Sequence, residues 1–258
     1  MKAQFRVDSE GKTDVGRIRK LNEDSLLVRP DLGLWVVADG MGGHDAGDFA
    51  SQTVVNELGQ LPRAASARGM LSAMEARIIA ANAMLRQEAA RRGANSMIGC
   101  TLASLVIFED AYACVWSGDS RVYRIRRGNL EQITKDHTEA QELIDHGTLT
   151  PEEAKTWPRK NVITRAIGVF DEPELDMVQG RIEDGDMFVI CSDGLTEHVD
   201  DPEILQSAGM YPLSSMVDHL INTTLERGAK DNVTVISVAC REVTAIQSDR
   251  TIAVRGTA

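Results

Sequence analysis

The sequence predicts an α+β fold in which short antiparallel strands alternate with blocks of helix. Apolar runs that end in turn residues, such as 33–39 and 186–193, have the length and composition of buried strands. Residues 67–92 and 213–227 instead repeat apolar side chains at helical spacing. No repeat, low-complexity linker or boundary rich in Pro and Gly divides the chain, so residues 1–240 are predicted to form a single domain.

The first part of the chain contains three predicted strands followed by two helices. The strands are 4–11, 24–30 and 33–39, and the third is apolar on both faces and is therefore expected to be buried. The helices are predicted at 45–58 and 67–92. The longer helix ends at Gly93 and places one apolar stripe on a single face, formed by Leu71, Met74, Ile78, Ala81 and Leu85.

The middle of the chain predicts an antiparallel meander. Three apolar runs, at 100–108, 111–118 and 121–128, are separated by two or three turn residues, which is too short for a parallel crossover. Within the third run, residues 124–127 alternate arginine with apolar positions. We interpret them as part of a strand and not as a basic patch.

The last part of the chain returns to strands after a polar segment. Residues 138–168 are polar and mixed, with a helix start at Thr150-Pro151. The sequence then predicts strands at 174–182, 186–193 and 232–239, and a helix at 213–227 that ends before Gly228. Residues 241–258 have no clear period and are expected to be loosely held.

The charge balance and the cysteines restrict the class of protein. Acidic residues number 39 against 28 basic ones, which gives a net charge of −11 without an evident basic patch, so a nucleic-acid partner is not expected. No apolar segment near residue 1 is long enough for a signal peptide or a membrane span, so we expect a cytoplasmic protein without a membrane partner. No heptad or large apolar patch is evident, and we expect a monomer. The four cysteines lie in apolar runs and are interpreted as reduced core thiols: Cys100, Cys114, Cys191 and Cys240.

Carboxylates recur where the predicted strands meet loops. Asp39 and Asp193 each end an apolar strand and precede a glycine. Asp119 follows another strand, Asp231 precedes the last one, and the acidic pair 23–24 precedes the second. Aspartate is common in turns, where its side chain caps backbone groups, and any one of these residues could have that role. Their combination favours a site for a hard divalent cation, because Mg²⁺ and Mn²⁺ take oxygen ligands.

Glycine after the acid has two candidate explanations. It would let the main chain bend so that its own carbonyl faces a cation, which would also compensate the clustered charge around Asp39. The alternative is a phosphate-binding loop, but neither GxGxxG nor GxxxxGK[ST] occurs in the chain. A serine nucleophile in GxSxG is also missing, and Cys191 ends an apolar strand without a phosphate-binding loop. We therefore interpret Asp39 as paired with metal.

Six short motifs follow an order that is typical of one family. They are RKLNED at 19–24, ADGMGG at 38–43, GDSR at 118–121, DHT at 136–138, CSDGL at 191–195 and KDNVTV at 230–235. With these motifs the chain resembles the metal-dependent type 2C (PPM) protein Ser/Thr phosphatases, most closely the bacterial members. The resemblance covers nearly the whole chain. It implies a four-layer α-β-β-α sandwich of two antiparallel sheets flanked by helices, with a variable flap at about 140–168.

The resemblance also implies a dinuclear metal centre at one end of the sandwich. Two Mn²⁺ or Mg²⁺ ions would be bridged by a water. Asp39 would bridge both ions, and the carbonyl of Gly40 would bind one of them. Asp193 and Asp231 would complete the protein ligands of one ion, and Glu23 would serve the other directly or through water.

Further positions match supporting roles in the family. Asp119, together with Asp193, resembles the pair that holds a third, weaker metal in bacterial members. Asp24 and Asn232 would support the site from behind the ligands, Asp24 by hydrogen bonding. Arg19 matches the phosphate-binding arginine, whose planar guanidinium can hold two phosphate oxygens at once.

The reaction implied is hydrolysis of phosphoserine and phosphothreonine on proteins, opposing a bacterial Ser/Thr kinase. The bridging water would attack phosphorus in line. The partners would be phosphorylated proteins, namely the kinase and its substrates. Three alternatives stay open: a phosphatase of one dedicated regulatory phosphoprotein, a hydrolase of small phosphoesters, and a binding module that has lost its metals. The presence of Asp39, Asp193 and Asp231 argues against the last.

The sequence departs from the animal members of the family at Met41. Those members carry a histidine at this position that is thought to protonate the leaving group, and methionine cannot do so. The proton source is therefore open between His44 and a metal-bound water. His137 in the DHT motif is interpreted as a structural hydrogen-bonding residue. Neither the choice between Mn²⁺ and Mg²⁺ nor the physiological phosphoprotein follows from the sequence.

Overall fold

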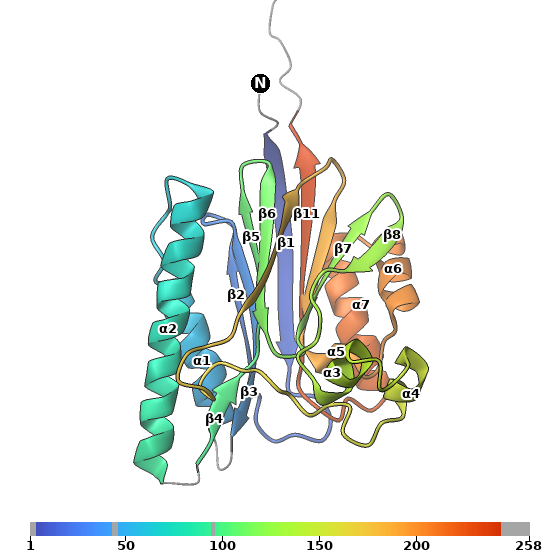
Figure 1. Ribbon diagram of the computed structural model, residues 1–258. Helices are drawn as coiled ribbons and strands as arrows, with labels where there is room; N and C mark the ends of the chain where they lie inside the picture. The colour runs from blue at the N-terminus through green and yellow to red at the C-terminus, as the bar shows by residue number, and fades with distance from the viewer. Residues whose placement is uncertain (1–3, 43–45, 94–95, 244–258) are drawn as a thin grey trace, which may run out of the picture.

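The protein is a four-layer sandwich in which two antiparallel sheets face each other and helices cover both outer faces (Figure 1). The computed structural model describes residues 4–42, 46–93 and 96–243. The predicted α-β-β-α arrangement is confirmed.

The first sheet has the strand order β1-β11-β10-β7-β8. Its strands are β1 (Phe5–Asp14), β7 (Arg121–Arg126), β8 (Asn129–Gln132), β10 (Met187–Cys191) and β11 (Val233–Glu242). Three helices pack on its outer face: α5 (Asp193–Thr196), α6 (Asp201–Met210) and α7 (Leu213–Glu226). The long pairing of β1 with β11 joins the two ends of the described chain, from Phe5 opposite Glu242 to Asp14 opposite Val233.

The second sheet has the order β2-β3-β5-β6-β9, with a short strand added at the end of β3. Its strands are β2 (Asp24–Arg29), β3 (Leu34–Gly42), β4 (Ile98–Cys100), β5 (Leu102–Phe108), β6 (Ala111–Ser117) and β9 (Asp176–Arg181). The helices α1 (Gly47–Gly59) and α2 (Ala67–Arg92) cover its outer face.

Alternation of side chains explains why β3 and β10 are apolar on both faces. In β3, Leu34 and Val36 pack toward α1 and α2, whereas Trp35 and Val37 lie between the sheets. In β10 the residues likewise alternate between the helices and the space between the sheets. Each sheet is therefore buried on both sides, as the continuous apolar run 33–39 predicts.

The predicted meander in the middle of the chain is wrong at its second connection. β5 and β6 form the expected hairpin, but residues 118–120 then carry the chain into the other sheet, where β7 pairs with β10. Gly118 permits this crossing because its φ is +109° and a Cβ there would lie 2.7 Å from Cβ of Thr101. The crossing brings Asp119 between the ends of the two sheets.

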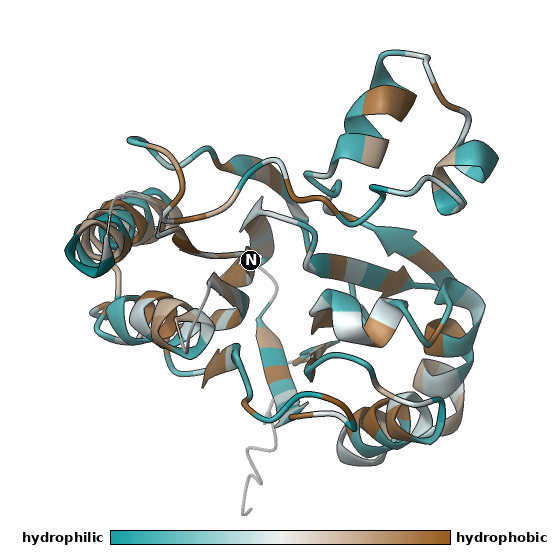
Figure 2. Ribbon diagram, turned by 90° about the horizontal axis from the view of Figure 1, so that it is seen from below, coloured by the Kyte–Doolittle hydropathy of each residue, from teal (hydrophilic) through white to brown (hydrophobic). Residues whose placement is uncertain are grey.

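A flap protrudes from the layered body between β8 and β9 (Figure 2). It carries α3 (Glu139–Asp145) and α4 (Pro151–Lys155). The base of the flap is closed where Thr138 pairs with Ile163. The predicted helix start is confirmed, because Thr150 and Glu153 cap α4 reciprocally and Pro151 occupies its first turn.

Some predicted element boundaries need correction. The helix expected from residue 45 begins at Gly47, and residues 43–45 lie outside the described ranges. β11 continues through Glu242, beyond the expected end at 239, because β1 offers hydrogen-bonding partners as far as Phe5. The first residues of the predicted loose segment therefore belong to a strand, and residues 244–258 lie outside the described part.

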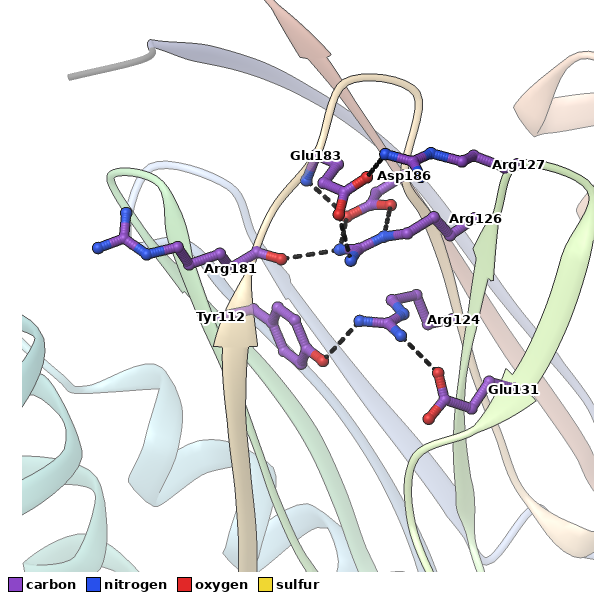
Figure 3. Close-up of polar contacts among 8 residues, drawn as sticks. All are labelled: Tyr112, Arg124, Arg126, Arg127, Glu131, Arg181, Glu183 and Asp186. Carbon is purple, nitrogen blue, oxygen red and sulfur yellow. Dashed lines mark hydrogen bonds and ion pairs between the residues drawn. The ribbon is translucent and has the colours of Figure 1, made fainter. Parts of the chain in front are cut away.

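At the end of the sandwich far from Asp119, arginines of β7 connect the two sheets (Figure 3). Arg124 donates to the hydroxyl of Tyr112 in β6 over 3.1 Å. Arg126 pairs with the fully buried carboxylate of Asp186 at 2.6 Å and with Glu183 at 2.9 Å. The interpretation as strand is confirmed for residues 124–126, since Ile125 packs toward the outer helices. Arg127 lies in the turn after β7, with a φ of +52°.

Two further expectations concern composition. All four cysteines are buried and unpaired, as predicted. None of the helices in the described ranges combines the length and the apolar content that crossing a bilayer would require.

Candidate metal centre

The predicted acidic residues meet at one end of the sandwich, the lower end in Figure 1. Asp24 at the start of β2 lies opposite Asp39 near the end of β3 in the antiparallel register. Asp193 follows β10 as the first residue of α5, and Asp231 precedes β11. The crossing after β6 adds Asp119. The ends of both sheets thus contribute carboxylates to one region.

Asp24 connects the two sheets behind the other carboxylates. Its Oδ2 atom accepts hydrogen bonds from the hydroxyls of Ser192 (2.7 Å) and Thr234 (2.6 Å), and its side chain also bonds Asp39. Burial raises the pKa of Asp24 to about 6, against the opposing effect of these hydroxyl donors. These hydrogen bonds fix Asp24 of the second sheet to residues of the first.

Asp39 experiences the charge of the whole cluster. Burial raises its pKa well above the usual range, and the nearby carboxylates of Asp24, Asp193 and Asp119 raise it further. Its backbone is fixed on Thr101, whose Oγ1 accepts from the Asp39 amide at 3.1 Å and whose own amide donates to the Asp39 carbonyl at 2.8 Å.

Close backbone approach explains the glycine that follows Asp39. A Cβ on Gly40 would lie 1.9 Å from the carbonyl oxygen of Gly47, and one on Gly47 would lie 2.2 Å from Oε1 of Glu23. The amide of Gly40 also donates to the carbonyl of Glu23 at 3.0 Å. The start of α1 can therefore pack against the end of β3 and against Glu23 only without side chains at these two positions.

The second Asp-Gly unit obeys the same restriction. A Cβ on Gly194 would lie 1.9 Å from the carbonyl oxygen of Asn232. Burial raises the pKa of Asp193 well above its usual range, and the charges of Asp119 and Glu197 add to the effect. Glycine thus places Asp193 next to the start of β11, where Asp231 is located.

Arg19 binds two of the predicted ligands. Its Nη2 atom donates to Oδ2 of Asp231 at 2.6 Å, and its Nη1 atom lies 3.6 Å from Oε2 of Glu23. The Arg19 side chain is 46% exposed, so its guanidinium also faces solvent at the mouth of the site.

Asn232 holds the loop that carries these groups. Its side-chain amide donates to the carbonyls of Val15 (2.9 Å) and Leu21 (3.0 Å), while its Oδ1 atom accepts from the amide of Glu23 at 2.7 Å. Both amide donors and the carbonyl oxygen of this buried side chain thus fix residues 15–23 against the start of β11.

Asp119 is buried without a hydrogen-bonding partner for its Oδ1 atom. Burial raises its pKa to about 7, and the charge of Asp136 contributes. An unpaired buried carboxylate oxygen is costly, because it has lost water without gaining a donor.

The residues present fit a divalent cation. In the part of the chain that the structure describes, no three Asp, Glu, His or Cys side chains already converge closely enough to hold one ion. Arg19 pairs with Asp231 and Glu23 instead, and Asp24 faces hydroxyl groups. The candidate ligands are nevertheless all oxygens, their charges raise one another's pKa, and Asp119 has an orphaned oxygen. A Mg²⁺ or Mn²⁺ ion would compensate the repulsion between the carboxylates and would give the unpartnered oxygen of Asp119 a ligand-binding partner.

The histidines divide between described and undescribed positions. His44 lies outside the described residues. His137 has the hydrogen bonds expected of a structural residue: Nδ1 accepts from the Gly118 amide at 3.1 Å, so Nε2 carries the proton toward Asp176, 3.1 Å away. Met41 pairs with Gly99 as part of β3 and β4 and carries no ionisable group.

Sequence reasoning missed several residues that position the site. Thr101, Ser192 and Thr234 hold the backbone or side chains of the carboxylates. Thr101 lies in none of the quoted motifs, whereas Ser192 and Thr234 lie in two of them but were given no role. Arg121 pairs with Asp136 at 2.6 Å and thereby joins the GDSR and DHT motifs. That pair could have been found from the sequence, since both residues stand in quoted motifs.

Fold and site together define a sandwich protein with an all-oxygen acidic centre between the ends of its two sheets. A family model described as Protein phosphatase 2C matches residues 18–235. This chain belongs to the protein phosphatase 2C family.

Individual relatives agree with this assignment. The serine/threonine protein phosphatase PstP of Mycobacterium tuberculosis is 38% identical over 226 residues, which are 87% of this chain and 43% of that protein. This chain therefore spans less than half the length of that relative. The solved structure of PppA, described as a key regulatory component of T6SS in Pseudomonas aeruginosa, superposes with a TM-score of 0.84 at 40% identity, covering 94% of this chain and 99% of that one. The catalytic domain of PstP in complex with two manganese ions gives a TM-score of 0.80 at 34% identity, over 92% and 100% of the two chains.

Proposed function

We propose that this chain hydrolyses phosphoserine and phosphothreonine esters of proteins with the help of two divalent cations, Mn²⁺ or Mg²⁺. The observation that carries the proposal is the group of carboxylates around Asp39, which raise one another's pKa where the two sheets end. Family membership supports the same reaction, as does the two-manganese structure of the PstP catalytic domain.

Each predicted site residue receives a role in this proposal. Asp39 would lie between the two ions, with the carbonyl of Gly40 on one of them. Asp193 and Asp231 would complete the protein ligands of one ion and Glu23 would serve the other. The orphaned oxygen of Asp119, with Asp193, is the position for a third, weaker ion.

The chain's own groups would orient and bind the substrate. Bound divalent ions supply Lewis-acid polarisation and a water of lowered pKa as nucleophile. Arg19 is placed to hold two phosphate oxygens, because its exposed guanidinium can turn from Asp231 to a phosphate that arrives from solvent. Asp24 and Asn232 would keep the ligand-bearing segments in place through their hydrogen bonds. Met41 cannot donate a proton, so the leaving alkoxide must receive one from another source.

The proposal extends to the substrates and the place of action in the cell. The substrates would be phosphorylated proteins, namely a bacterial Ser/Thr kinase and the proteins that this kinase phosphorylates. The enzyme would act in the cytoplasm as a monomer.

Phosphate release from a phosphothreonine peptide tests the proposal. The protein is first stripped with a chelator and then assayed with and without added Mn²⁺, beside a small aryl phosphate. Release from the peptide only when Mn²⁺ is present is the expected result. Turnover of the aryl phosphate with no release from any phosphopeptide would contradict the protein substrate, and silence on both would contradict the enzyme.

A further inference from the structure

An open groove of about 550 Å³ lies between the flap and the body, next to the candidate metal centre. We call it the flap groove. The flap contributes residues of α3 and α4, and the body contributes α5 and the start of α6. Asp119 and Asp193 of the candidate centre line the same groove. A peptide whose phosphorylated residue reaches the centre would therefore have neighbouring residues close to this groove.

The flap is held to the body by polar contacts. The side-chain amide of Asn161 donates to Oε1 of Glu197 at 2.8 Å, which joins the flap to the segment after α5. Lys135 pairs with Asp145 of α3 at 2.5 Å. These contacts give the groove a defined width without a bound peptide.

Acidic charge predominates on the groove wall. Glu197 and Asp201 line the groove and form no ion pair among the described residues. Arg121 is already neutralised by Asp136, and Lys155 pairs with Glu152. Of the basic residues in the lining, Lys160 alone forms no ion pair with a described residue. The uncompensated charge of the groove is therefore negative.

Asp119 lies where the groove meets the candidate metal centre. Its side chain is more than nine-tenths buried and its Oδ1 atom has no hydrogen-bonding partner, and the proposed function assigns this atom to a metal ion. The negative charge that a peptide side chain would meet in the groove therefore comes from Glu197 and Asp201. The lining also contains apolar side chains, such as Ile144 and Pro151, but its unpaired charges are predominantly acidic. The wall would repel an acidic residue and attract a basic one.

We propose that the flap groove selects phosphoproteins that carry a lysine or arginine close in sequence to the phosphorylated serine or threonine. This inference rests on the proposed phosphatase function and adds a substrate class to it. The positive side chain would lie along the groove toward Glu197 and Asp201, while the phosphate occupies the centre. Selectivity would come from attraction of a lysine or arginine of the substrate and from repulsion of an aspartate or glutamate at the same position.

The test compares matched phosphothreonine peptides that differ at one position. Arginine, alanine or glutamate is placed in turn at each of the three positions on either side of the phosphothreonine, and kcat/KM is measured with saturating Mn²⁺. At the best position the arginine peptide should exceed the glutamate peptide by about tenfold at low salt, and the ratio should shrink as ionic strength rises.

A charge reversal on the wall provides the matched variant. Asp201→Lys should lower the arginine-to-glutamate ratio at least about threefold, because it replaces an attraction for the peptide's arginine by a repulsion at the groove wall. Glu75→Lys makes the same change on the exposed face of α2 and should leave the ratio unchanged. Comparing two peptides within one enzyme cancels any effect of the substitution on the chemical step.

The outcomes separate this inference from the function on which it rests. Activity on all peptides with a ratio near one at every position, or a ratio that survives in Asp201→Lys, would overturn the groove proposal alone. An arginine-to-glutamate ratio that falls to one as the Mn²⁺ concentration rises would show that Glu197 and Asp201 bind metal ions. That result would also overturn the groove proposal. Absence of Mn²⁺-dependent release from every peptide and from an aryl phosphate would instead overturn the phosphatase function.

Discussion

Asp39 is the residue on which the charges of the candidate centre converge. Burial and four other carboxylates raise its pKa, so its negative charge is unfavourable until a cation compensates it. We expect Asp39→Asn to lower kcat on a phosphothreonine peptide at least about a hundredfold while the melting temperature is kept. Asp218→Asn, on the exposed face of α7, is the control. Retained activity in Asp39→Asn would rule out the bridging role.

Arg19 presents its guanidinium both to Asp231 and to solvent. Its replacement by alanine should mostly raise KM for phosphopeptides, by about tenfold, because a charge-assisted hydrogen bond to phosphate is lost. Saturating Mn²⁺ keeps any change in metal affinity out of the comparison. Lys20→Ala removes a neighbouring exposed charge and should leave KM unchanged. An unchanged KM in Arg19→Ala would place Arg19 outside the phosphate site.

Asp24 makes the stability of the metal-free protein depend on pH. The unfolded chain loses this proton near the ordinary value of 3.8, whereas the folded protein keeps it up to about 6. Stability therefore falls as pH rises through this window, since the unfolded state binds fewer protons. Asp24→Asn removes this pH-dependent loss of stability, because asparagine carries no proton to lose. The substitution should therefore raise the free energy of unfolding near pH 7.5, on the order of 3 kcal/mol.

Urea unfolding in the presence of a chelator checks this prediction at two pH values. The gain from Asp24→Asn should be present near pH 7.5 and absent near pH 4, where Asp24 is largely protonated in the folded protein. Equal gains at both pH values would show that something other than the proton of Asp24 is responsible.

Among the elements, β7 carries the contacts that connect the sheets away from the site. Arg126→Met would leave the carboxylate of Asp186 buried without its cation and should destabilise the fold by about 3 kcal/mol. Arg181→Met removes an arginine that is 81% exposed and pairs with Asp110, so a loss below about 1 kcal/mol is expected. Denaturant midpoints of the two variants give the comparison, and equal losses would contradict it.

The periodicity of the longer strands and helices was predictable, but the strand that each one pairs with was not. Continuous apolar runs predict β3 and β10 directly, because each strand is buried on both faces. The three residues 118–120 fit a hairpin as well as a change of sheet, and only the tight contact of Gly118 with Thr101 decides between them. The short strands β4 and β8 also escaped prediction. One adjoins the apolar run at 100–108, and the other is a polar edge strand.

At the scale of the whole molecule, the carboxylates of the candidate site were predictable from the sequence. The residues that hold these carboxylates in place by hydrogen bonds were not. Strands that end in Asp-Gly identified Asp39 and Asp193 as site residues, and both reach the same end of the sandwich. The reason for the glycines was only partly anticipated, since the structure requires them for contact with the carbonyls of Gly47 and Asn232. Ser192 and Thr234 became visible only when the strands were assembled, because their role depends on the position of Asp24.

The central claim is that the strand ends hold two divalent ions, and calorimetric titration of the chelator-stripped protein with Mn²⁺ tests it most directly. Two ions should bind per chain, with a third, weaker event that Asp119→Asn removes. Stoichiometry should fall in Asp39→Asn, because both ions share that carboxylate. A titration that shows no binding, or full binding of two ions in Asp39→Asn, would contradict the claim.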